Sequence, residues 1–200
     1  MAPRAALVEI ARDFHARGFM WGTAGNLSVR ADDDHFWITA SSLPKGRLAD
    51  DDFLLIRAKD YAVIEQARPG LKPSAETAIH GTIYRQVPNA GAILHGHSVA
   101  ACRATERVKK GARALRLPAL EMLKGFDIWQ QNAKVDLPVF DNHLDVERIA
   151  KAIEARLRKT QPAMTALMVR AHGPTVWGQS PQQAYDRFEC LEFIFRYLAR

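Results

Sequence analysis

The 200 residues are enough for one domain with a sizeable core, and 48% hydrophobic and 25% charged residues are ordinary for a globular protein. The 28 basic residues exceed the 22 acidic ones, which gives a net charge of +6. The basic residues are scattered, which argues against nucleic-acid binding and is compatible with a small anionic substrate. No apolar run reaches the length of a membrane span, and the N-terminus lacks the apolar centre of a signal peptide.

The two cysteines, Cys102 and Cys190, fall in expected helices far apart in the sequence. A pair so placed suits a reducing compartment better than a disulfide framework. We therefore expect free thiols in a cytoplasmic protein that contacts neither membrane nor nucleic acid.

The N-terminal half alternates apolar stretches with polar loops. A stripe of apolar residues predicts the first helix, which Gly18 can end. An expected hairpin then brings together two polar loops, residues 22–26 and 39–46. The expected elements of this half are a helix at 3–17 and strands at 26–30, 35–39, 54–56 and 61–64.

From residue 74 onward, the sequence predicts helices that begin after the N-cap candidates Ser74, Ser98 and Asp145, and a last helix that opens at Pro181. Residues 108–117 are expected to form a loop, and residues 120–125 have no clear preference. Because short turns join many strand neighbours, we expect an α/β fold with a mixed, largely antiparallel sheet between two helical layers, in one domain over residues 1–200. The further strands are expected at 92–94, 135–140, 166–169 and 176–177.

The segment from Ala90 to Ser98 carries the most informative chemistry. An apolar run leads directly into His95-Gly96-His97, and residues two apart on a strand point to the same face. Two convergent imidazoles suit a divalent transition metal, above all zinc. Two partly exposed histidines at a strand end are the simpler alternative for this motif alone.

A third ligand candidate is His172, which also follows an apolar strand. Three histidines leave a metal position open for catalysis. Proton transfer would need an acid or base, for which Glu76 and Glu121 are the candidates. Either could instead be ordinary, Glu76 as a helix-start carboxylate and Glu121 as a partner of Lys124. His80, in the middle of a helix, is expected to be a satisfied packing residue.

The two polar loops carry many small hydrogen-bonding groups. Backbone amides, hydroxyls and a lysine in such loops can cradle a phosphate, and Ser74 at a helix start could add a donor. Ordinary turn chemistry is the alternative for either loop by itself. No nucleotide-binding glycine motif is present.

Five segments in order, GTAGNLSVR, ITASS, KPSAET, HGHS and AHG, resemble the class II aldolase/adducin family over nearly the whole chain. The resemblance implies one zinc ion held by His95, His97 and His172, with Glu121 as proton donor and acceptor. It gives Glu76 a role in metal binding or proton transfer. It also implies phosphate-binding positions at Asn26, Ser41, Ser42 and Ser74, with Lys45 and Lys72 as helpers.

Within the family, the pieces LEMLKG, LPVFDN and HGPTVWG favour a branch that dehydrates a phosphorylated ketose in methionine salvage. A zinc-dependent sugar-phosphate aldolase or 4-epimerase is the main alternative, and a non-catalytic adducin-like interaction module is a remote one. Relatives form homotetramers, so a homotetramer is expected here. Many relatives have threonine where this chain has Gly96, a change that could alter substrate fit.

Overall fold

The computed structural model describes residues 3–109 and 111–199. Its strands are β1 (Asn26–Arg30), β2 (His35–Thr39), β3 (Phe53–Arg57), β4 (Val63–Gln66), β5 (Ala92–His95), β6 (Ala114–Leu117), β7 (Val135–Phe140), β8 (Ala166–Val169) and β9 (Gly173–Gly178). They form a nine-stranded sheet in the order β4-β3-β2-β1-β5-β9-β8-β7-β6. The β7–β8 pair is parallel and the other neighbours are antiparallel.

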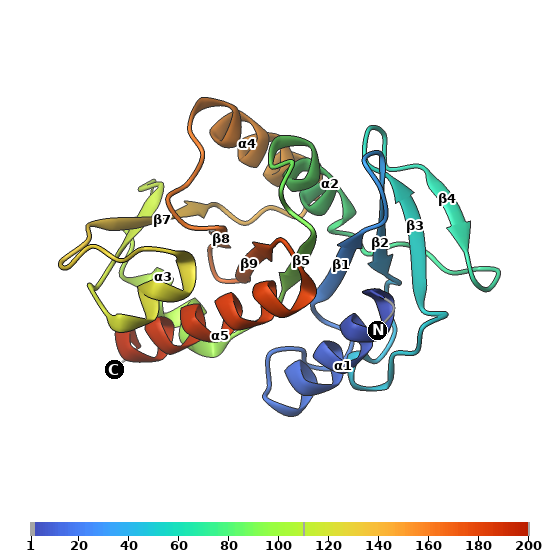
Figure 1. Cartoon of the computed structure of the whole chain (residues 1–200), viewed down its shortest axis with the longest axis horizontal. Coiled ribbons are helices and arrows are strands. Elements are labelled where there is room, and N and C mark those ends of the chain that lie inside the picture. Colours follow the sequence, from blue (N-terminus) through green and yellow to red (C-terminus); the bar gives the residue numbers. More distant parts are fainter. Residues whose placement is uncertain (1–2, 110, 200) are drawn as a thin grey trace.

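Helices cover both faces of this sheet. They are α1 (Pro3–Ala16), α2 (Thr77–Gln86), α3 (Val99–Glu106), α4 (Val146–Lys159) and α5 (Pro181–Leu198), with 3-10 helices η1 (Lys45–Arg47) and η2 (Glu121–Phe126). In Figure 1, α2 and α4 lie on one side and α1, α3 and α5 on the other. The expected three-layer arrangement with a mixed, largely antiparallel sheet is therefore confirmed.

Strand β5 lies in the middle of the sheet and is apolar on both faces. Ala92 and Leu94 belong to the hydrophobic cluster under α1, α3 and α5, whereas Ile93 belongs to the cluster under α2 and α4. All three side chains are fully buried. A strand covered on both faces must be continuously apolar, which explains why this run does not alternate.

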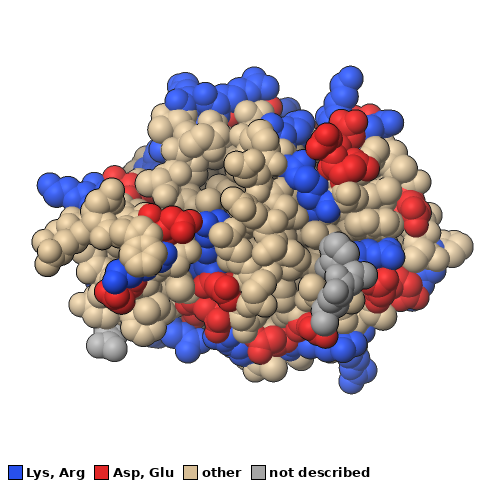
Figure 2. Space-filling view, in the orientation of Figure 1, with Lys and Arg blue, Asp and Glu red and all other residues tan. Residues whose placement is uncertain are grey.

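Charged side chains do not gather into one basic surface on the face shown in Figure 2. Basic side chains lie over α4 at the top, and elsewhere on this face blue and red side chains are interspersed. In the described part of the chain, no helix is both long enough and apolar enough to cross a membrane.

The expected loop at residues 108–117 is wrong in its last part, because β6 forms there and pairs with β7. Leu115 and Leu117 are buried while Ala114 and Arg116 are exposed, as a half-covered edge strand requires. The side chain of Arg116 also forms an ion pair with Asp136 on β7. Four residues of alternation within a basic segment are too few to identify a strand from the sequence.

The expected N-cap of α2 is also wrong, since Glu76 occupies the cap position and not Ser74. Ser74 lies in the turn before the helix, where its Oγ accepts from the Glu76 amide at 3.2 Å and its carbonyl accepts from the Thr77 amide at 3.1 Å. This turn carries the Glu76 side chain toward the end of β5. The caps predicted at Ser98 and Asp145 are confirmed, and both side chains accept hydrogen bonds from helix amides.

Gly96 faces the protein core and not the site. A Cβ atom there would lie 2.9 Å from the Phe188 ring and 3.1 Å from the Phe19 carbonyl. Gly173 is similarly tight, since its Cβ would lie 2.1 Å from the Gly96 carbonyl. The glycine between the two histidines therefore makes room for Phe188. Packing of the core requires a residue without a Cβ atom at this position.

Replacing Gly96 with threonine is expected to destabilise the protein, because overpacking a filled core costs about 1–3 kcal/mol. For a chain of this size, that cost lowers the melting temperature by roughly 2–10 °C. Thermal unfolding followed by circular dichroism measures the change. Adding Phe188→Leu to the Gly96→Thr variant should recover part of the lost stability. If the stability losses of the two single variants simply add in the double variant, the proposed contact between position 96 and Phe188 is contradicted.

Candidate metal centre

Three histidine side chains meet where β5 ends and β9 begins. His95 is the last residue of β5, and His172 directly precedes β9, which pairs with β5. Ala171, at φ +51° in the left-handed region, makes the turn that returns His172 from the end of β8. The three ring centroids lie 4.6–4.9 Å apart, and each residue offers a ligand atom within 4.8 Å of the others.

His95 has the hydrogen-bonding pattern of a metal ligand. Its Nδ1 lies 2.9 Å from the Pro174 carbonyl, which can only accept, so the ring proton is on Nδ1. The Nε2 atom is buried without a hydrogen-bond partner in the described protein. An orphaned nitrogen lone pair that faces two other imidazoles fits a bound cation.

The other two histidines lie beside His95, and His97 is suited to bind a metal in its neutral form. The Nε2 atoms of His97 and His172 lie 3.1 Å apart. Burial, helped by the neighbouring His95 and His172, lowers the pKa of His97 to about 4. Burial likewise lowers the pKa of His95. Neutral imidazoles at neutral pH can coordinate a divalent ion without first losing a proton.

Glu76 adds a buried carboxylate to the three histidines. Its Oε2 lies 3.2 Å from His95 Nε2, and its Oε1 lies 3.0 Å from His172 Nε2. Burial opposes ionisation, but His95, His172 and a 2.8 Å hydrogen bond from Asn26 Nδ2 outweigh it and hold the pKa of Glu76 well below its usual range. The charged carboxylate can serve as a further metal ligand or accept a proton.

A buried chain of hydrogen bonds begins at Asn26, the residue that donates to Glu76. His80 Nε2 donates to Asn26 Oδ1 at 2.6 Å, and Ser28 Oγ donates to His80 Nδ1 at 2.6 Å. The Tyr84 hydroxyl donates to Ser28 at 2.9 Å. His80 was expected to be a satisfied packing residue, and sequence reasoning missed its hydrogen bond to Asn26. Its place four residues after Glu76 on one helix face was the available signal.

Lowering the pH from 7 to 5 should destabilise the metal-free protein in part through His80. Burial lowers the pKa of His80 to about 3, whereas the unfolded side chain takes up its proton near 6.5. The free energy of unfolding therefore falls as the pH drops from 6.5 toward 3, by about 2 kcal/mol at pH 5 from this group. Urea unfolding at both pH values should show that His80→Gln loses less free energy of unfolding between pH 7 and pH 5 than the wild type does. An equal loss in the two proteins would contradict the contribution assigned to His80.

The loops with the phosphate-binding candidates lie together beside Glu76. The Ser41 amide donates to the Lys72 carbonyl at 2.8 Å, and Ala40 forms a β-bridge with Pro73. Ser41 and Ser42 are partly exposed, with their Oγ atoms 3.4 Å apart, and Ser74 is half-buried. The structure thus brings the serines predicted from separate segments onto adjoining loops.

The remaining phosphate candidates differ in their surroundings. Asn26 is buried, and its amide is engaged by Glu76 and His80. Lys45 is also buried, and its Nζ donates to the Ala40 and Leu43 carbonyls at 3.3 and 3.0 Å. Burial lowers the pKa of Lys45 to about 8. The Lys72 side chain is exposed beside the serine loops.

Glu121 lies apart from the histidine cluster in the described chain. It begins η2 with a 73% exposed side chain, and Lys124 Nζ donates to its carboxylate at 2.5 Å. The two residues border a hollow of about 370 Å³ with Trp129, and no histidine of the cluster lines it. Within a single chain, Glu76 contacts the metal-ligand candidates and Glu121 does not.

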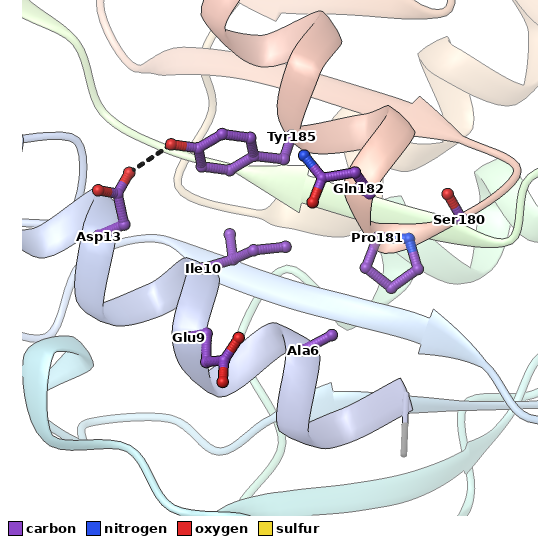
Figure 3. A pocket seen from close by; sticks show the side chains of 8 residues that line it. All are labelled: Ala6, Glu9, Ile10, Asp13, Ser180, Pro181, Gln182 and Tyr185. Carbon is purple, nitrogen blue, oxygen red and sulfur yellow. Dashed lines mark hydrogen bonds between the residues drawn. The ribbon is translucent and has the colours of Figure 1, made fainter. Parts of the chain in front are cut away.

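Another hollow lies away from the histidines and has no comparable chemistry. It measures about 490 Å³ and lies between α1 and the start of α5. Figure 3 shows Asp13 and Tyr185 facing each other across it, and the Tyr185 hydroxyl donates to Asp13 at 2.7 Å. None of the three clustered histidines lines this hollow. Its size alone does not make it the functional site.

A family model described as the class II aldolase and adducin N-terminal domain matches residues 5–199. The chain belongs to the class II aldolase/adducin family. This family is typically metal-dependent, in agreement with the three-histidine site described above.

Curated members of the class II aldolase/adducin family are similar over nearly the full chain. The methylthioribulose-1-phosphate dehydratase of Microcystis aeruginosa is 47% identical, with 98% of this chain and 94% of the relative covered. The enzyme of the same name from Leptospira biflexa is 38% identical, with 97% and 95% covered.

Solved structures of class II aldolase relatives share the fold. YgbL from Klebsiella pneumoniae has a TM-score of 0.80 at 26% identity, with 98% of this chain and 87% of that chain covered. The L-fuculose-1-phosphate aldolase of Thermus thermophilus has a TM-score of 0.74 at 26% identity, with 97% and 92% covered. The chain therefore shares its fold with an aldolase of known structure.

Proposed function

We propose that this protein dehydrates 5-methylthioribulose 1-phosphate to 2,3-diketo-5-methylthiopentyl 1-phosphate in methionine salvage. The observation that carries the proposal is the cluster of three histidines with an orphaned Nε2, in a chain 47% identical to a dehydratase of that substrate. One zinc ion per subunit, held by His95, His97 and His172, is the proposed cofactor. A cytoplasmic homotetramer is the proposed form of the enzyme.

Zinc at this position would supply a Lewis acid that polarises the substrate's ketone and neighbouring hydroxyl. The protein's own groups do the rest. Asn26 would hold Glu76 in place through their 2.8 Å hydrogen bond. The loops with Ser41, Ser42 and Ser74 would bind the phosphate, with Lys45 and Lys72 adding positive charge, and would thereby orient the sugar chain.

The reaction removes a proton from C3 and a hydroxide from C4. We assign both proton movements to Glu121, which would take the C3 proton and return it to the leaving hydroxyl as water departs. The enol that remains then tautomerises to the diketone. Because Glu121 lies outside the histidine cluster of its own chain, we place it at the cluster of a neighbouring subunit. Glu76 is the proposed metal ligand or second proton carrier.

Product identification tests the reaction. Purified, zinc-loaded protein is mixed with 5-methylthioribulose 1-phosphate, and the products are measured by mass spectrometry. Loss of one water without fragmentation is expected. Cleavage into two fragments would indicate an aldolase, and an isomer of unchanged mass would indicate a 4-epimerase. A protein that holds no metal and changes no substrate would indicate an adducin-like interaction module.

A further inference from the structure

A cavity of about 390 Å³ opens directly beside two of the metal-ligand candidates. His97 and His172 form part of its wall. The volume lies within the range of small-molecule sites. A substrate held by the histidines can therefore extend into this cavity. The other lining residues are Trp21, Ser98, Val99, Cys102, Asn142 and Ala171.

Apolar side chains form another part of the cavity wall. Trp21 is 64% exposed and Val99, the first residue of α3, is 68% exposed, which is high for such side chains. The Cys102 thiol completes this wall and donates to the His172 carbonyl at 3.6 Å. The hydroxyl of Ser98 is occupied as the cap of α3. These groups offer an apolar and sulfur-compatible surface, with little to bind a phosphate.

The phosphate-binding candidates lie outside this cavity. None of Asn26, Ser41 or Ser74 is among its lining residues, and the serine loops adjoin Glu76 instead. A substrate that spans the metal position would therefore have its phosphate at the loops and its other end in the cavity. For the proposed substrate, that other end is a methylthio group.

We propose that Trp21 and Val99 form the subsite that binds the methylthio group. The inference rests on the proposed function and adds the residues that recognise the substrate's tail. A thioether sulfur interacts favourably with an aromatic ring, and the methyl group gains from contact with apolar surface. Both side chains would lose exposure to water when this tail is bound.

The test compares two substrates that differ only in the tail, 5-methylthioribulose 1-phosphate and 5-deoxyribulose 1-phosphate. The wild-type protein should prefer the first in kcat/KM. Trp21→Ala should reduce this preference roughly ten-fold, as expected when apolar contacts are lost from a hydrophobic pocket. Val99→Ala should reduce it by a smaller factor. Phe193→Ala and Val63→Ala, which remove exposed apolar side chains outside the cavity, should leave the preference unchanged.

A binding measurement separates this proposal from the proposed reaction. Calorimetry of the zinc-loaded protein with 5-methylthioribitol 1-phosphate and 5-deoxyribitol 1-phosphate, which lack the ketone, reports tail recognition without turnover. Weaker binding of the methylthio probe alone in Trp21→Ala supports the subsite even if no dehydration occurs. If Trp21→Ala weakens the binding of both probes equally, the proposed subsite is overturned. A changed oligomeric state with an unchanged tail preference would identify the surface as a contact between copies, which also overturns it.

Discussion

Replacing His97 with alanine is expected to abolish tight metal binding and nearly all turnover. One of three imidazoles is lost, and removing even an outer partner of a metal ligand typically costs 10–100-fold in affinity, so the loss here should exceed about 100-fold. Without a Lewis acid worth several kcal/mol, turnover should fall on the order of 1,000-fold or more. Metal content by atomic emission and initial rates measure the two effects.

The matched control is His35→Ala. His35 lies in the β1–β2 hairpin and pairs with Asp32, so its replacement should change neither metal content nor turnover. Circular dichroism shows whether each variant is folded. A folded His97→Ala protein with full metal content and normal turnover would contradict the ligand set.

Replacing Glu121 with glutamine should leave metal content intact and lower turnover by about 10²–10⁴-fold, the usual contribution of a general acid or base. Glutamine keeps the shape of the side chain and removes its ability to exchange a proton. Steady-state rates and metal analysis of the same sample test this directly. Near-normal turnover would remove Glu121 from the mechanism and leave Glu76 as the proton carrier.

Mixing two inactive variants tests where Glu121 acts. If it serves the histidine cluster of a neighbouring subunit, co-refolded Glu121→Gln and His97→Ala chains will contain sites with an intact cluster from one chain and an intact Glu121 from the other. Activity should then return to a substantial fraction of the wild type. No recovery in mixed oligomers, verified by tagging each chain, would show that Glu121 acts only within its own chain.

Much of the metal centre could be predicted because its residues carry local signals. His95 and His172 each follow a short, wholly apolar run, and strand ends of one sheet converge. Glu76 could be recognised as a candidate from its place near a helix start. The order of the strands that brings these segments together depends on long-range pairing, which no local pattern contains.

Other features have no local signal. The residues around Glu121 form a 3-10 helix without a clear hydrophobic period, so neither its structure nor its surroundings could be predicted. Trp21 and Val99 come from a loop and a helix start, and only the folded chain places both beside the histidines. The expected effect of Gly96 on substrate fit stays a prediction, and the contact that a Cβ there would make with Phe188 appears only in the folded chain.

The central position of β5, between β1 and β9, also has a consequence for biosynthesis. The strand that carries His95 pairs with β1, far upstream in the sequence, and with β9, far downstream. Such non-local pairings form slowly, because large loops must close first. If the three histidines bind a metal, the full ligand set exists only once His172 has been made, so the metal cannot guide the folding of the strands made earlier.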